Sequence, residues 1–125
     1  HFYWESQDTI PSAKRFVSAF QAKWGYPPTG YAGYAYSGAL ELLNAIERAK
    51  TLEPDKVAKQ LEGREYDNYK GKQWWRACDH QSFQDWYIMK GRDATKGEWG
   101  FFEIVERIPA SESMEYTCAE QKKKA

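Results

Sequence analysis

The chain has 125 residues, which is the length of one ordinary domain or of a piece of a larger protein. Its 18 basic and 18 acidic residues cancel to a net charge of +0, which argues against a nucleic-acid-binding module because such modules neutralise phosphates with a basic face. No apolar run approaches the roughly 20 residues that a membrane-spanning helix needs.

The first residues predict a strand. Phe2-Tyr3-Trp4 is a short aromatic run, and no initiator Met or signal peptide precedes it. We therefore expect a processed protein or, in preference, a fragment that begins in the middle of a fold. A polar turn over residues 6–9 should follow this strand.

The first predicted helix follows that turn and ends before Gly25. Pro11 suits the first helical turn, and Asp8 or Thr9 can cap it. Gly25 supplies a left-handed stop. The apolar residues of this segment recur on one helical face, which predicts an amphipathic helix: Ala13, Phe16, Val17, Phe20 and Trp24.

Two further helices are predicted, over residues 30–50 and 53–63. The longer one has an apolar stripe consisting of Ala32, Ala35, Ala39, Leu42, Leu43 and Ile46. In the shorter one, Val57 and Leu61 lie one turn apart. Three amphipathic helices need a sheet to cover. The number and length of the remaining strands therefore show whether this chain contains that sheet.

Three short strands are predicted after the helices, at residues 73–76, 86–89 and 101–108. The polar segment 78–81 joins the first two. Residues 91–100 form a loop, and residues 109–125 form a polar tail. These strands are too few to make a sheet for three helices, so the pattern indicates an α/β fragment whose main sheet lies elsewhere.

The triplet Cys78-Asp79-His80 is the only cluster of residue types typical of metal or nucleophile chemistry. A zinc site needs three or four ligands, and no second Cys/His cluster is present. We therefore favour a turn joining two strands and predict no metal site, no cofactor and no catalytic residue. An enzyme that uses His80 remains an alternative.

Cys78 and Cys118 are the two cysteines of the chain. A bridge between them would close a loop of roughly 40 residues and contribute about 4 kcal/mol in the chain-entropy model. The alternative is two unrelated thiols in a reducing compartment.

Aromatic residues are abundant, at 17% of the chain. Tyr31, Tyr34 and Tyr36 open the second helix, and Trp4 ends the first strand. These rings could line a ligand cleft in which free helix N–H groups attract a carboxylate. The alternative is that the rings fill the core in place of aliphatic residues, and Tyr31 is the ring for which the cleft is best supported.

Several segments, in the same order, resemble the C-terminal part of type I periplasmic binding proteins, and more narrowly the branched-chain amino-acid (leucine/isoleucine/valine) binding proteins of ABC importers. The resemblance covers most of residues 1–108. The residues that carry it are Phe2–Glu5, Phe16–Gly25, Pro27-Pro28, Gly33–Ala49, Glu53–Gly63, Tyr69–Gly71 and Trp75–Gln81.

The resemblance implies a fragment of a bilobed α/β fold, with residues 1–108 as the C-terminal portion of that fold and residues 109–125 as a tail. The three helices would pack on a sheet of the N-terminal lobe. The implied function is the solute-binding component of an ABC importer, which binds an amino acid or a related carboxylate or amide between two lobes and is not an enzyme. A receptor's ligand-sensing domain and an aromatic-rich carbohydrate-binding module are the alternatives.

The same resemblance implies partners, location and site residues. The partners would be the small-molecule ligand, the permease subunits and the N-terminal remainder of the protein. A periplasmic location, secreted or lipid-anchored, favours the Cys78–Cys118 bridge. Tyr31 corresponds to the family's ligand-contacting aromatic before the long helix, and Trp4 is a second ligand-binding candidate.

Overall fold

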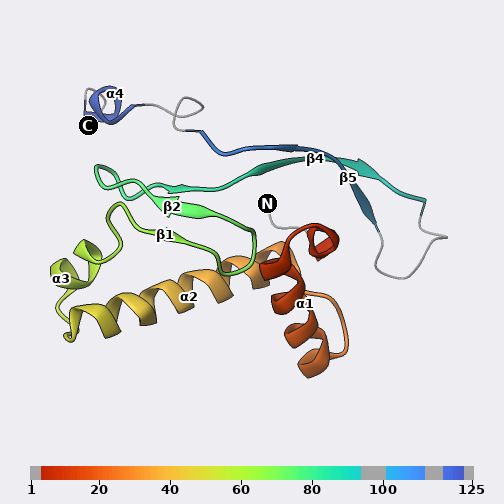
Figure 1. Ribbon diagram of the computed structural model, residues 1–125, viewed down its shortest axis with the longest axis horizontal. Coiled ribbons are helices and arrows are strands. Elements are labelled where there is room, and N and C mark those ends of the chain that lie inside the picture. The colour runs from red at the N-terminus through yellow and green to blue at the C-terminus, as the bar shows by residue number, and fades with distance from the viewer. Residues whose placement is uncertain (1–3, 94–100, 112–116, 123–125) are drawn as a thin grey trace.

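The computed structural model describes residues 4–93, 101–111 and 117–122 (Figure 1). Its helices are the short 3-10 helix η1 (Trp4–Asp8) and the α-helices α1 (Pro11–Trp24), α2 (Gly30–Ala49), α3 (Pro54–Lys59) and α4 (Cys118–Lys122). Its strands are β1 (Glu65–Tyr66), β2 (Gln73–Trp75), β3 (Ser82–Phe83), β4 (Trp86–Gly91) and β5 (Phe102–Ile108).

The strands form two small antiparallel sheets. One sheet has the order β1-β2-β3, and the other is the antiparallel pair of β4 and β5, which lies at the upper right in Figure 1, above η1 and α1. No parallel pairing occurs among the residues that the structure describes. This agrees with the predicted fold class, in which three helices and short strands are present and the main parallel sheet is largely missing.

The core lies between η1, α1 and the loop that follows β1. Its buried cluster consists of Ile10, Ala13, Phe16, Val17 and Tyr69. Partly buried aromatic side chains pack against this cluster from α1, α2, η1 and β4: Trp4, Phe20, Tyr34 and Tyr87. Aromatic rings thus supply much of the core, which agrees with the alternative that rings take the place of aliphatic residues there.

The boundaries of α1 agree with the prediction, but its predicted cap is wrong. Ile10 is the N-cap residue, with no side-chain capping bond, and the Lys14 amide donates to the Ile10 carbonyl at 3.0 Å. Because Pro11 at the first position has no N–H, one of the donors that a cap would satisfy is absent. Gly25 ends the helix in the left-handed region, as predicted.

The predicted strand at residues 2–4 is wrong where the structure can test it. Phe2 and Tyr3 lie outside the described residues, and Trp4 begins the 3-10 helix η1. This helix contacts α1, and the Trp4 side chain packs against the core cluster. At Trp4 the chain is therefore helical and packs against α1 instead of continuing as a strand.

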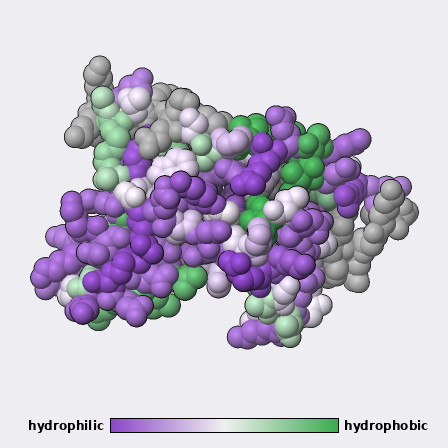
Figure 2. Space-filling view, in the orientation of Figure 1, coloured by the Kyte–Doolittle hydropathy of each residue, from purple (hydrophilic) through white to green (hydrophobic). Residues whose placement is uncertain are grey.

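In α2 the helix is as predicted, but its apolar stripe does not face this chain's own core. The buried residues of α2 are Gly33, Ser37, Glu41 and Ala45. By contrast, Leu42 and Leu43 are 50% and 62% exposed. Figure 2 shows apolar residues at the lower edge of the molecule, in the region that α2 and α3 occupy in Figure 1. A helix with an exposed apolar side is expected of a fragment that lacks its main sheet.

The third helix is shorter than predicted. α3 ends at Lys59, because the Gln60 and Leu61 amides bond three residues back, to Val57 and Ala58, and tighten the last turn. Gly63 then adopts a left-handed conformation, with φ at 69°, and turns the chain into β1.

Two of the five strands within the described residues were not predicted. The strands β1 and β3 have two residues each, too short for any periodicity to reveal, and both pair with β2. The predicted strands at 86–89 and 101–108 correspond to β4 and β5, which pair with each other. The predicted loop at 91–100 lies mostly outside the described residues.

The tail contains structure that the sequence did not predict. The helix α4 lies within residues 109–125, and the structure joins its Cys118 to Cys78 in a disulfide, with the two Cα atoms 6.0 Å apart. The bridge attaches the tail to the loop between β2 and β3. Among the described helices, none combines the length and apolar character needed to cross a membrane.

Candidate functional site

Tyr31 lies on the first turn of α2 and is 77% exposed. Its position is set by the preceding segment, in which Pro27 and Pro28 are buried and Thr29 caps the helix. The Ala32 amide donates to Thr29 Oγ1 at 3.3 Å. An aromatic ring is thus held in an exposed position beside the amino end of a long helix, where the helix dipole favours negative charge.

The other rings named from the sequence have different surroundings. Trp4 and Tyr34 both pack against the core cluster, one from η1 and one from α2. Tyr36 stacks on Phe16 of α1, with ring centroids 4.6 Å apart. The structure therefore brings Trp4 and Tyr34 to one cluster and uses Tyr36 to join two helices. Tyr31, one turn before Tyr34, is more exposed than Tyr36, at 77% against 41%.

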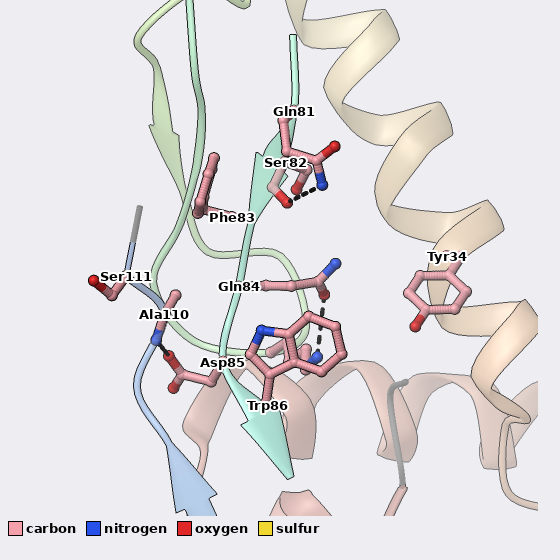
Figure 3. A pocket seen from close by; sticks show the side chains of 10 residues that line it. Tyr34, Gln81, Ser82, Phe83, Gln84, Asp85, Trp86, Ala110 and Ser111 are labelled. Carbon is pink, nitrogen blue, oxygen red and sulfur yellow. Dashed lines mark hydrogen bonds between the residues drawn. The ribbon is translucent and has the colours of Figure 1, made fainter. Parts of the chain in front are cut away.

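A pocket of about 280 Å³ lies between α2 and the segment that carries β3 into β4. Tyr34, Lys70 and residues 81–86 line it, together with residues 110–111. Figure 3 shows Gln84 extending from the link between β3 and β4 toward Tyr34, with Trp86 beside it, whereas Asp85 points the other way, toward Ala110. This pocket begins one helical turn from Tyr31.

Lys70 contributes a buried ammonium group to this pocket. The residue is 2% exposed, its Nζ donates to Gln84 Oε1 at 3.2 Å, and it lies 5.1 Å from the centre of the Tyr87 ring. Burial lowers the pKa of Lys70 to about 8, an effect that the charge of Asp85 partly offsets and that of Arg107 reinforces.

Asp85 anchors the opposite side of the pocket. Its Oδ1 accepts from the Ala110 amide at 2.9 Å, and its Oδ2 accepts from Arg107 Nε. This ion pair ties the start of β4 to the end of β5.

Sequence reasoning did not identify Lys70, Gln84 or Asp85. A single Lys followed by Gly carries no signal of burial, and the pocket forms only when residues from α2, the loop after β1 and the β3–β4 segment come together. The one available signal was the pair of polar residues, Gln84-Asp85, between two predominantly aromatic strands.

The Cys78-Asp79-His80 triplet forms a turn, as favoured from the sequence. The Asp79 carboxylate binds Arg76, with Arg76 Nε 3.0 Å from Oδ1, and accepts from the Gln81 amide at 3.1 Å. The Arg76 guanidinium holds the pKa of Asp79 below its usual range. His80 adopts a left-handed conformation, with φ at 58°, and its Nε2 lies 3.5 Å from Glu62 Oε1.

Each side chain of the triplet thus has a structural partner, and Cys78 is in the disulfide. Across the described residues, no group of three His, Cys, Asp or Glu side chains could hold a metal ion.

Comparison with known proteins identifies the fold. The model of a family described as periplasmic binding protein matches residues 1–97. Among curated proteins, none matches the chain. Several solved structures do, and three of them are described below.

An amino acid ABC transporter substrate-binding protein from Pseudomonas fluorescens Pf-5 is 27% identical, with a TM-score of 0.74 over 82% of this chain and 28% of that protein. An ABC-type branched-chain amino acid transporter from Rhodopseudomonas palustris CGA009 is also 27% identical, with a TM-score of 0.74 over 87% of this chain and 29% of that protein. A periplasmic binding protein from Burkholderia mallei is 25% identical, with a TM-score of 0.77 over 95% and 31%.

This chain therefore spans less than a third of the length of these relatives. The match agrees with the resemblance drawn from the sequence, with the fold class expected of a fragment, and with the expectation of a binding protein rather than an enzyme. On the family model and these structures, the chain belongs to the periplasmic binding protein family.

Proposed function

We propose that this chain is part of the solute-binding component of an ABC importer, located in the periplasm, and that the whole protein binds an amino acid or a related carboxylate or amide. The observation that supports this proposal is the family match together with two relatives whose names give amino acid ABC transport. The Cys78–Cys118 disulfide is consistent with an oxidising compartment such as the periplasm.

In this proposal Tyr31 forms part of the wall of the cleft between two lobes. Its side chain lies at the surface of this chain, on the first turn of α2. The amino end of α2 beside it favours a carboxylate through the helix dipole. Closure of the lobes on the solute would bury both, and a membrane permease would then recognise the closed form.

Trp4 is the second ligand-binding candidate in this proposal. Because its side chain packs against the core cluster, Trp4 would hold the wall of the cleft in place as well as contact the solute. Replacement by Phe would keep an aromatic ring in the core, so Trp4→Phe rather than Trp4→Ala is the suitable variant.

The test is calorimetric titration of the full-length protein, which contains this chain and both lobes, with leucine and with the other amino acids. Tyr31→Ala is expected to weaken binding by about 1–3 kcal/mol, the scale of a lost ring contact, whereas Tyr31→Phe should keep most of the affinity. Leu52→Ala is the matched control, because Leu52 is 78% exposed and lies beyond the other end of α2. Unchanged affinity in Tyr31→Ala would remove this residue from the site, and no amino acid binding at all would overturn the proposal.

A further inference from the structure

The buried ammonium of Lys70 has no counter-ion among the described residues. Its one hydrogen bond goes to a neutral amide oxygen, Gln84 Oε1, and no described carboxylate forms an ion pair with it. A buried charge without a partner is costly, and an anion at the same place removes that cost.

Three hydrogen-bond donors beside the pocket share one acceptor, the side-chain oxygen of Gln84. Gln84 Oε1 accepts from Lys70 Nζ at 3.2 Å, from Gln73 Nε2 at 3.3 Å and from Tyr69 Oη at 3.5 Å. A carbonyl oxygen has two lone pairs, and an ammonium alone has three N–H groups to donate. Donor capacity at Lys70 therefore remains for an acceptor that enters the pocket.

Asp85, the acidic residue among the described lining residues, binds groups other than Lys70. The Asp85 oxygens accept from Arg107 Nε and from the Ala110 amide, so the charge of Asp85 is balanced by Arg107. With that pair neutral, the described residues that line the pocket carry a net charge of one positive unit, which is that of Lys70. This charge suits one monovalent anion.

We propose that this pocket binds the carboxylate of a small organic acid, with the carboxylate at Lys70 Nζ and the body of the acid between Tyr34 and Trp86. The walls fit this class of ligand, because the aromatic side chains of Tyr34 and Trp86 both line the pocket. A volume of about 280 Å³ suits a ligand smaller than the drug-sized ligands of typical pockets. The proposal stands apart from the role of Tyr31, which does not line this pocket.

Protonation of Lys70 makes this binding dependent on pH. The charged groups that act on it are Asp85 and Arg107, and the neighbouring rings belong to Tyr87 and, through Gln84, to Tyr69. Burial lowers the Lys70 pKa to about 8. Because a carboxylate prefers the charged ammonium, its affinity should fall as the pH rises through 8, and its binding should raise this pKa.

The test is calorimetric titration of the whole polypeptide with benzoate, and with benzamide as the uncharged analogue. We expect benzoate to bind at pH 7 and benzamide to bind at least about tenfold more weakly. Lys70→Met should lower the affinity for benzoate by about tenfold or more. Lys72→Met is the matched control, because Lys72 lies two positions away, is 67% exposed and pairs with Glu65 at 2.7 Å. Its affinity for benzoate should equal that of the wild type.

A second measurement keeps the proposal testable if Lys70→Met does not fold. The side-chain resonances of Lys70 in wild-type protein, followed by NMR against pH, should titrate near 8 and move upward when benzoate is added. A pKa above 10 without any response to benzoate would mean that the ammonium is already paired within the polypeptide, and this would overturn the proposal. Equal benzoate affinity in Lys70→Met, or no benzoate binding, would overturn it as well. Since Tyr31→Ala tests the transport role separately, either proposal can fail while the other holds.

Discussion

Arg76 and Asp79 form a two-bond ion pair that closes the turn between β2 and β3. Arg76 Nε lies 3.0 Å from Asp79 Oδ1, and a second bond joins the same two side chains. Arg76 is 6% exposed and also lies over the Phe83 ring, 4.8 Å from its centre. One guanidinium therefore joins the turn to the buried side of β3, and Asp79 balances its charge.

Asp79→Ala should consequently destabilise the protein. Removal of the carboxylate leaves the buried Arg76 guanidinium without its partner, and we expect a loss of about 1–3 kcal/mol in the free energy of unfolding. Asp79→Asn, which keeps one acceptor, should cost less. His80→Asn is the comparison, because His80 is exposed and Asn tolerates its left-handed conformation, so this change should have little effect. Urea unfolding measures all three, and equal stability of Asp79→Ala and wild type would contradict the structural role.

The disulfide between Cys78 and Cys118 predicts a mass change and a stability change. Reduction should raise the intact mass by about 2 Da, the mass of two hydrogens. Because the bridge has a sequence separation of 40, its loss should lower the free energy of unfolding by up to about 4 kcal/mol. Cys118→Ser serves as the control, since reduction should then change neither quantity. Equal masses before and after reduction of the wild type would exclude the bridge.

The buried Lys70 predicts that stability rises with pH in one window. Its pKa is lowered from 10.5 to about 8 on folding, so between these values the unfolded chain binds a proton that the folded chain does not. The free energy of unfolding should therefore increase from about pH 8 to about pH 10, by at most about 1.4 kcal/mol per pH unit.

Tyrosines end this rise. Burial raises the pKa of Tyr87 from 10.0 to about 12 and raises that of Tyr69 in the same direction. Above pH 10 the unfolded chain loses these protons first, so stability should fall again. Urea unfolding at several pH values, without added carboxylate, measures both the rise and the fall of the free energy of unfolding. Lys70→Met should abolish the rise, and a flat or falling profile in the wild type between pH 8 and 10 would contradict the burial of a neutral amine.

The exposed side of α2 predicts an effect that depends on the rest of the protein. Leu43 is 62% exposed in this chain, and an exposed substitution ordinarily changes stability by less than about 0.5 kcal/mol. If the main sheet of the whole protein covers this side, Leu43→Lys should cost about 2–4 kcal/mol there, the scale of a disrupted core. Thermal or urea unfolding of the whole polypeptide measures this. A neutral effect would show that nothing covers Leu43.

Local sequence determined α1, α2, the start of α3 and the longer strands, but not η1 or α4. Proline at a first turn and glycine at a stop fix the ends of α1 by backbone geometry alone, and the 3.6-residue period of α2 is long enough to identify from spacing. The Asp79 turn was also within reach of the sequence, because a lone Cys-Asp-His triplet lacks enough metal ligands. The family followed from the order of these segments.

Only the tertiary structure decided which side of α2 is buried and where a ligand pocket forms. The apolar stripe of α2 pointed to one side, but the chain's own core lies against the other, where Ser37 and Glu41 bond to Asn68. The pocket joins Tyr34, Lys70 and Gln84, which are distant in sequence. Burial of an amine depends on the summed desolvation and packing of such distant groups, and no local pattern of residues encodes that sum.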